Sequence, residues 1–362
     1  MSTRFKPVPA CGQRTVLSAA SIALALLVFC APVAAKNGQA LDRHFLGANP
    51  VCARPMAVPV LLVADLTLTG EIDDSISLVM YDRLERLGCV SVLGIVSVFG
   101  NGRSSTKQIH HNLMVRLPRL GLARWSLLRG PDESYREVRN RRARRPASER
   151  HGTAADQARL RAIASVINRA DTPVAIVELG PMTVSARLLA GGFVSSRQIG
   201  RVVGVGGRME GERFGTNGGL VGRFGNFTDF NVRKDTTAVD YLIRHAPEKM
   251  LLVTYRLGVG ERMVTAAMIE EAVPALASHA RDRARWLSRM LGYTGIPSWD
   301  TWTTAVFIAG RRAKLGCART YGRLQTEPGA KWPRLIVGQR VGVGSPITIC
   351  HPGVTLNPGT PD

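Results

Sequence analysis

The chain has 362 residues, of which 45% are hydrophobic, so it can bury the core of one large domain or two small ones. Its 48 Lys and Arg residues against 27 Asp and Glu residues give a formal net charge of +21. A basic chain raises the question of nucleic-acid binding. However, the arginines are scattered, only 6% of the residues are aromatic, and the sequence has no zinc-finger or RNA-binding motif. We therefore expect no specific nucleic-acid partner.

The N-terminal segment has the pattern of a cleaved signal peptide. A basic leader precedes an apolar run over residues 16–33, which ends in Val33-Ala34-Ala35, with small residues where signal peptidase cuts. A membrane anchor is the alternative, but the run is short and Pro32 interrupts it. No later segment approaches the roughly 20 apolar residues of a membrane span. We predict a signal peptide at 1–35, a domain at 36–362 without a membrane span, and a secreted or periplasmic location.

Cleavage would leave Cys52, Cys89, Cys317 and Cys350. An even number of cysteines in an exported protein predicts one or two disulfides. Four cysteines allow three pairings, and proximity in the sequence favours Cys317 with Cys350. No Cys-x-x-Cys spacing supports zinc or redox chemistry.

Apolar runs of strand length alternate with segments of helical spacing. Strands are predicted at residues 58–64, 90–99, 174–177, 202–205, 251–254 and 334–337. Helices are predicted at residues 75–87, 106–120, 184–189, 236–245 and 268–291, and residues 130–157 are expected to form a long mobile connection. Strands that are apolar throughout indicate a parallel sheet covered on both faces. The predicted fold class is α/β, with an open, mainly parallel, Rossmann-like sheet and helices on both faces.

Polar and glycine-rich segments follow several predicted strands, where the sites of open parallel sheets lie. Residues 65–74, with Asp65 and the pair Asp73-Asp74, follow the first strand, and Gly100-Asn101 follows the second. Later segments are Leu179-Gly180-Pro181-Met182-Thr183, the block from Asn226 to Asn231, and Trp299-Asp300. Carboxylates at a helix start are commonly only caps, so it is the combination of segments that indicates a site.

In this order the segments resemble those of the inosine-uridine nucleoside hydrolase family, over roughly residues 56–310. That family has an Asp-rich loop after the first strand and a Gly-Asn after the second. A Gly-Pro-Leu-Thr-like turn, an Asn…Glu-Phe-Asn…Asp block and a late His-Asp or Trp-Asp pair follow. The resemblance implies the nucleoside hydrolase fold and hydrolysis of the N-glycosidic bond of ribonucleosides to ribose and free base.

The resemblance also implies a calcium site and a sugar site. Ca²⁺ takes oxygen ligands, which here would come from Asp74, Asp300 and the main-chain carbonyl of Leu179. Asp65 and Asp73 would be the catalytic carboxylates, because carboxylates stabilise an oxocarbenium-like sugar. The residues expected to bind the sugar and the base are Asn101, Asn226, Asp229, Asn231 and Trp299. The implied partner is a small-molecule nucleoside or ribose, and a homo-oligomer remains compatible with the sequence.

Three positions depart from the family's pattern. Thr67 replaces an Asp that binds calcium and acts as general base, which would leave the metal site one carboxylate short. Asp229 replaces a Glu and retracts the carboxylate by one methylene. Trp299 stands where many members have a His that protonates the leaving base, while purine-preferring members have a tryptophan that stacks on the purine. The sequence predicts a calcium-dependent purine ribonucleoside hydrolase, with a catalytically impaired ribose- or nucleoside-binding homologue as the alternative.

Overall fold

The first strand of the computed structural model lies between two apolar cores. Strand β1, Val58–Ala64, places Leu62 in one core and Leu61 and Val63 in the other. Successive side chains of a strand point to opposite faces, so both faces of this strand are covered. The structure describes residues 39–47, 52, 57–69, 72–209, 229–307, 315–325, 334–338 and 344–352. The predicted signal peptide and Asn226 lie outside these residues.

The described strands form one sheet in the order β3-β2-β1-β4-β5-β7-β10-β8-β9-β6. The strands from β3 to β10 in this order run parallel, and β8 pairs antiparallel with both β10 and β9. The bounds of the strands after β1 are Val90–Ser97 (β2), Leu127–Arg129 (β3), Val174–Glu178 (β4), Ile199–Val205 (β5), Arg208–Met209 (β6), Met250–Val253 (β7), Cys317–Gln325 (β8), Arg334–Gly338 (β9) and Ser345–Cys350 (β10). The predicted open, mainly parallel sheet is confirmed.

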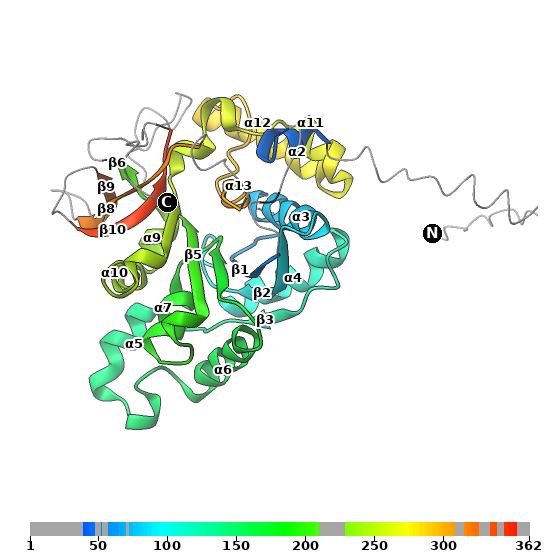
Figure 1. Cartoon of the computed structure of the whole chain (residues 1–362). Coiled ribbons are helices and arrows are strands. Elements are labelled where there is room, and N and C mark those ends of the chain that lie inside the picture. The colour runs from blue at the N-terminus through cyan, green and yellow to red at the C-terminus, as the bar shows by residue number, and fades with distance from the viewer. Residues whose placement is uncertain are drawn as a thin grey trace, which may run out of the picture. The chain divides into compact units, whose positions relative to one another are not determined.

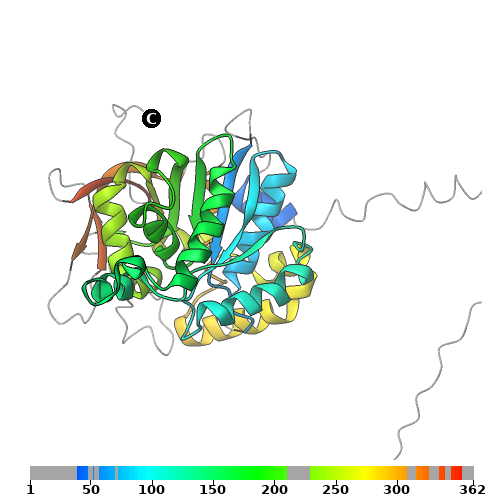
Figure 2. The same ribbon diagram turned by 90° about the horizontal axis from the view of Figure 1, so that it is seen from below.

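Helices cover both faces of the sheet (Figure 1, Figure 2). One core contains side chains of α2, α3, α4, α11, α12 and α13, and the other contains side chains of α6, α7, α9 and α10. The bounds are Gln39–Phe45 (α2), Asp73–Arg86 (α3), Thr106–Arg119 (α4), Tyr135–Arg141 (α5), Ala154–Asn168 (α6), Thr183–Ala190 (α7), Phe230–Lys234 (α9), Thr236–His245 (α10), Ala266–Ala272 (α11), Ala277–Leu291 (α12) and Trp302–Ala305 (α13). Among the described residues, no helix is long and apolar enough to span a bilayer.

The prediction of one helix over residues 268–291 is wrong. Helix α11 ends at Ala272, a short 3₁₀ helix covers Pro274–Leu276, and α12 begins at Ala277. Proline has no amide hydrogen and disfavours helical backbone in the residue before it. Val273 accordingly leaves the helical conformation, with φ −142° and ψ 76°.

The prediction of a long mobile connection over residues 130–157 is also wrong. The segment contains α5 and the start of α6, and a buried ion pair fixes it to α7. Arg187 donates to Asp156 at 2.7 Å and to the carbonyl oxygen of His151 at 2.8 Å. The carboxylate of Asp156 also accepts from the amides of Asp132 and Glu133. The polar composition suggested a solvated loop. The contacts that order the segment could not be foreseen, because their partners are distant in the sequence.

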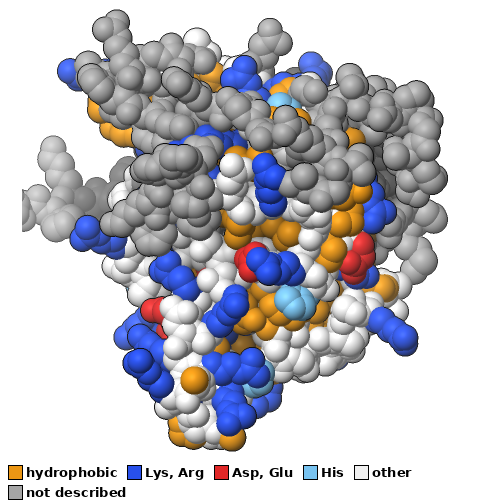
Figure 3. Space-filling model, turned by 90° about the vertical axis from the view of Figure 1, so that its left-hand side faces the viewer, with side chains coloured by type: hydrophobic (Ala, Val, Ile, Leu, Met, Phe, Trp, Pro, Cys, Tyr) orange, Lys and Arg blue, Asp and Glu red, His pale blue; other side chains and the backbone are white. Residues whose placement is uncertain are grey.

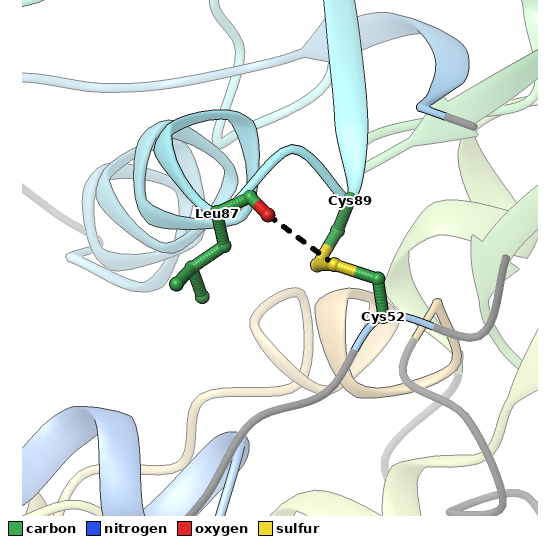
Figure 4. Close-up of a disulfide and its surroundings, with 3 residues drawn as sticks. All are labelled: Cys52, Leu87 and Cys89. Carbon is green, nitrogen blue, oxygen red and sulfur yellow. Dashed lines mark hydrogen bonds between the residues drawn. A yellow bond between two sulfur atoms is a disulfide. The ribbon is translucent and has the colours of Figure 1, made fainter. Parts of the chain in front are cut away.

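Two disulfides link the four cysteines. Cys317 pairs with Cys350, as proximity in the sequence predicted, and Cys52 pairs with Cys89. The second bridge ties the segment before β1 to the start of β2, and the sulfur of Cys52 lies 3.4 Å from the carbonyl oxygen of Leu87 (Figure 4). The sequence separations are 37 and 33 residues. Loops of this length restrict the unfolded chain enough to contribute about 4 kcal/mol each.

One face of the protein carries several basic side chains. In Figure 3 these Lys and Arg side chains lie among uncharged, hydrophobic and a few acidic ones. In the arginine-rich stretch after β3, Arg141 and Arg145 form ion pairs with Glu133. Two of the arginines therefore form ion pairs that fix α5 and the segment after it to Glu133.

Candidate functional site

The carboxylate of Asp65 packs against two glycines, at positions where any larger residue would clash with it. Asp65 follows β1 and is buried. A Cβ atom on Gly100, after β2, would lie 1.8 Å from Asp65 Oδ2, and a Cβ on Gly180, after β4, would lie 2.8 Å from Asp65 Cγ. The Nδ2 of Asn101 donates to Asp65 Oδ1 at 3.4 Å. Because β2 and β4 flank β1 in the sheet, the Gly-Asn and Gly-Pro segments meet around this one side chain.

A second group of carboxylates lies at the start of α3. Asp73, Asp74 and Asp300 are buried, and each offers an oxygen within 4.8 Å of the others. The set contains Asp74 and Asp300, which the resemblance assigned to the metal, with Asp73 as the third carboxylate. Asp65 does not belong to this group.

Helix α3 itself brings Asp300 to this position. Ser77 Oγ donates to the carbonyl oxygen of Asp300 at 3.2 Å, and the hydroxyl of Tyr81 lies 3.1 Å from that of Thr303. Positions 73, 77 and 81 are four residues apart, so they share one helix face. The face of α3 that carries Asp73 therefore also binds Asp300 and Thr303, which places the Asp300 carboxylate beside that of Asp73.

Two positive groups of the protein partly offset the negative charge of these carboxylates. Burial raises the pKa of Asp73, while the guanidinium of Arg283 and a hydrogen bond with Asp300 act in the opposite direction. The start of α3 adds the positive end of the helix dipole. Three buried carboxylates repel one another unless protons or a cation compensate their charge. Their hard oxygen atoms are the ligands that Ca²⁺ prefers, so the donor set fits this ion.

Helix α9 links the ends of several strands. The Nδ2 of Asn231 donates to the carbonyl oxygen of Leu179 at 3.1 Å, while the amide of Leu179 donates to Val63. This carbonyl is the one expected to bind calcium, and its oxygen has a second lone pair. The ammonium group of Lys234 donates to the carbonyl oxygen of Gly102, in the loop after β2.

Asp229 is engaged by three donors of the protein. As the N-cap of α9 it accepts from the amide of Val232 at 3.0 Å, and it also accepts from the amide of Gly207 at 2.6 Å and the hydroxyl of Tyr255 at 2.9 Å. Burial raises the pKa of Asp229 to about 6, against the effect of these donors. The carboxylate thus joins α9 to the loop after β5 and to the end of β7, and a sugar would have to share it.

Tyr255, which donates to Asp229, also fixes the indole of Trp299. Its Nε1 donates to the carbonyl oxygen of Tyr255 at 2.9 Å, and the two rings pack edge to face with centroids 5.5 Å apart. A Cβ on Gly258 would lie 2.3 Å from Trp299 Cδ1, so the indole lies directly on the backbone there. The side chain is half-buried, which leaves part of the indole accessible.

The comparison with family models decides the family. A model described as inosine-uridine preferring nucleoside hydrolase matches residues 66–342, well over half of the chain. The chain belongs to this nucleoside hydrolase family. No curated protein sequence matches it.

Solved nucleoside hydrolases and related proteins share its fold. A plant nucleoside hydrolase, PpNRh1, superposes with a TM-score of 0.60 at 17% identity, covering 83% of this chain and 95% of the other. The type III effector XopQ, complexed with adenosine diphosphate ribose, gives 0.52 at 15% identity, with coverages of 92% and 94%. A purine-preferring ribonucleoside hydrolase from Gardnerella vaginalis gives 0.51 at 16% identity, with coverages of 81% and 92%.

Sequence reasoning missed two buried residues near the candidate site. Tyr255 joins Asp229 to Trp299, and its position directly after β7 was a signal that could have been used. Glu178 ends β4 and is fully buried, and burial raises its pKa to about 8. Its carboxylate accepts from the amide and hydroxyl of Ser185. A glutamate at the end of an apolar run gave no signal of burial.

Proposed function

We propose that the protein hydrolyses the N-glycosidic bond of purine ribonucleosides in a calcium-dependent reaction, giving ribose and the free base. Membership of the nucleoside hydrolase family supports N-ribohydrolase chemistry in general. The observation that carries the proposal for this chain is the buried group of Asp73, Asp74 and Asp300 at the same strand-end edge as Asp65. Such an edge is where open α/β sheets bind their ligands.

Ca²⁺ would be held by Asp74 and Asp300, with Asp73 beside them and the carbonyl of Leu179 as a further ligand. When bound, the ion supplies positive charge that binds the ribose hydroxyls and increases the acidity of oxygen atoms around it. XopQ contains a ribose compound in a related fold, which supports a ribose site.

The side chains of the protein would do the rest. Asp65 and Asp73 place negative charge beside the sugar, where it stabilises the positive charge that develops as the glycosidic bond breaks. Asn101 fixes the carboxylate of Asp65 through the hydrogen bond described above. Asn231 offers an amide at the end of β4, and Asp229 keeps α9 in place.

The purine preference rests on Trp299. Its half-buried indole offers a flat surface for a base, and its Nε1 is already bonded to Tyr255. Stacking of aromatic rings contributes about 0.5–1.5 kcal/mol beyond the burial of area, and a purine offers the larger ring. The purine-preferring hydrolase from Gardnerella vaginalis has a related fold, which is compatible with this choice.

A single assay tests this proposal. Ribose release from inosine, guanosine and uridine is measured with calcium and with a chelator. We expect calcium-dependent release that is faster for the purine nucleosides. Release that is insensitive to the chelator would contradict the calcium site, and equal release from uridine would contradict the base pocket.

Thr67 favours a second candidate function, binding of a nucleoside or ribose without turnover. A threonine hydroxyl cannot serve as a general base at neutral pH, and the loss of a general base typically lowers a rate about 10²–10⁴-fold. The variant Thr67→Asp separates the two functions. For an impaired homologue, it should strengthen calcium binding in calorimetry and raise nucleoside cleavage. If the native protein already turns over and Thr67→Asp lowers its rate, another group is the base.

We also propose that the protein is exported to the periplasm or the medium. The basic leader, the apolar run and Val33-Ala34-Ala35 support cleavage after Ala35. Mass spectrometry of the protein from its native host should find a mature chain that begins near Lys36. A mature chain that still begins at Met1 would contradict export by this route.

A further inference from the structure

An arginine-rich stretch lies on the surface at α5 and at the two 3₁₀ turns that follow it, Arg142–Arg144 and Ala147–Glu149. Seven of the fifteen residues 136–150 are arginines, and two are glutamates. Two of the arginines pair with Glu133, as described above. Four others are exposed and form no ion pair within the part of the chain that the structure describes, namely Arg139, Arg142, Arg144 and Arg150. These four side chains are the arginine patch.

Hydrogen bonds to neighbouring helices hold the backbone of this stretch. At its start, the amides of Tyr135 and Arg136 donate to the carboxylate of Asp235 at 2.6 and 3.3 Å. Near its end, Nε2 of Gln157, on α6, donates to the carbonyl oxygen of Ser148 at 2.5 Å. A partner would therefore find the backbone already ordered, which lowers the entropic cost of binding.

Aromatic rings border the arginine patch. The ring of Tyr135 packs against that of Tyr241 with centroids 5.3 Å apart, and Tyr241 stacks on His245 at 4.3 Å. The charges of Arg139 and Arg142 act on the hydroxyl of Tyr135. These two arginines are three positions apart in helical backbone, so they are neighbours on one face. Figure 3 shows the side of the molecule on which α5 and α10 lie in Figure 1, and basic side chains gather in its lower part.

The arrangement of these rings distinguishes two classes of anionic partner. Single-stranded nucleic acid binds by stacking its bases on ring faces beside a basic groove. Here Tyr241 and His245 already cover each other's faces, and Tyr135 packs against Tyr241 as well. At a bilayer surface, a tyrosine needs only an apolar body that is partly buried and a polar tip in water. Tyr135 and Tyr241 are half-buried, so the rings suit lipid headgroups better than nucleobases.

We propose that the arginine patch binds the surface of an anionic phospholipid bilayer, with its guanidinium groups on the lipid phosphates. The guanidinium group matches phosphate in geometry and forms charge-assisted hydrogen bonds with it. Clusters of basic residues are attracted by the negative surface potential of anionic lipids. The formal net charge of +21 adds to this attraction. The proposed export would bring the chain to such a surface, while the inference does not depend on the proposed reaction.

Cosedimentation with lipid vesicles tests the inference on the protein as its native host produces it. Vesicles of phosphatidylcholine alone are compared with vesicles that contain equal parts of phosphatidylcholine and phosphatidylglycerol. We expect binding to the mixed vesicles only, and weaker binding at high salt because the ions screen the charges. Each arginine near an anionic bilayer strengthens binding about fivefold. Replacing the whole patch in Arg139→Gln/Arg142→Gln/Arg144→Gln/Arg150→Gln should therefore weaken binding at least about 100-fold.

A control variant removes the same charge elsewhere. Helices α2, α4 and α12 contribute to the first core, whereas Tyr135 of α5 packs against the other. Exposed arginines of these three helices are replaced in Arg43→Gln/Arg119→Gln/Arg285→Gln/Arg289→Gln. This variant should keep most of the binding to the mixed vesicles, because the patch is intact.

The remaining outcomes overturn the inference. Equal binding to both kinds of vesicle, or binding to neither, contradicts recognition of anionic lipid. Unchanged binding of the patch variant, or an equal loss in the control variant, means that the patch has no special part in binding. A single-stranded oligonucleotide is titrated alongside. If only its binding is lost in the patch variant, while vesicle binding is retained, the patch is a nucleic-acid site instead.

Discussion

The substitution Glu178→Gln should remove a pH dependence of stability that the buried carboxyl of Glu178 causes. Its Oε1 accepts from the amide and the hydroxyl of Ser185 at 2.8 and 2.6 Å, and Asp235 adds a negative charge nearby. Burial raises the pKa of Glu178 from 4.5 to about 8, so the folded protein keeps this group protonated at pH 7. Glutamine preserves the acceptor oxygen and has no proton to lose.

The sign and size of the effect follow from the two pKa values. Because the folded-state pKa is the higher one, the stability due to the protonated form is complete below pH 4.5 and is lost as the pH rises through 8. At about 1.4 kcal/mol per pH unit, the total loss is at most about 5 kcal/mol. Between pH 5 and pH 9 it amounts to about 4 kcal/mol, and Glu178→Gln should not show this loss.

Denaturant unfolding at pH 5, 7 and 9 measures the effect, with the disulfides kept oxidised. The difference in unfolding free energy between Glu178→Gln and the wild type should grow by several kcal/mol in favour of the variant as the pH rises. The exposed Glu248→Gln serves as a matched control, and it should follow the wild type. Parallel pH profiles of Glu178→Gln and the wild type would mean that Glu178 is ionised in the folded protein, and the reasoning would be refuted.

Three further substitutions probe the site. Gly100→Ala would place a Cβ 1.8 Å from Asp65 Oδ2 and should lower nucleoside turnover at least about 100-fold while circular dichroism stays unchanged; full activity would remove Asp65 from the mechanism. Trp299→Ala should lower the ratio of inosine to uridine cleavage, and an unchanged ratio would mean that the indole only packs against Tyr255. Tyr255→Phe should cost about 1–3 kcal/mol in unfolding free energy because Asp229 and the amide of Phe230 lose a partner; a loss below the error of the measurement would contradict this network.

The central fold was predictable because both faces of its parallel strands are buried. The runs that became β1, β2, β4, β5 and β7 are mostly apolar, and the segments 75–87, 106–120, 184–189 and 236–245 form helices as predicted. Strands β8 and β10 were missed because their burial alternates, as it does in antiparallel strands at the side of a sheet. The break in the helix at Pro274 was readable, since proline lacks an amide hydrogen and disfavours helical backbone in the residue before it.

The site was predictable as a set of segments, while the partners of each side chain were not. The order of the family's motifs placed Asp65, Asn101 and Gly180 at neighbouring strand ends. In the structure Asn101 bonds to Asp65, and Gly180 leaves room for its carboxylate. The hydrogen bonds of Asp229 to Gly207 and Tyr255 depend on how β5 and β7 lie side by side. No local pattern encodes such a contact, so a carboxylate expected to bind sugar could not be recognised as one that also holds α9.

The position of Asp73 changes what Thr67 means for the reaction. From the sequence, Thr67 left the calcium site one carboxylate short. In the structure three carboxylates still meet, because Asp73 stands beside Asp74 in the first turn of α3 and opposite Asp300. Calcium affinity depends on the charge of the ligands, so in the proposed site this arrangement would compensate in part for Thr67 in binding. Proton transfer would need another carboxylate in place of the missing Asp, and Asp65, which is buried against Gly100 and Gly180, is one candidate. Thr67→Asp should accordingly raise the rate by a larger factor than it raises the calcium affinity.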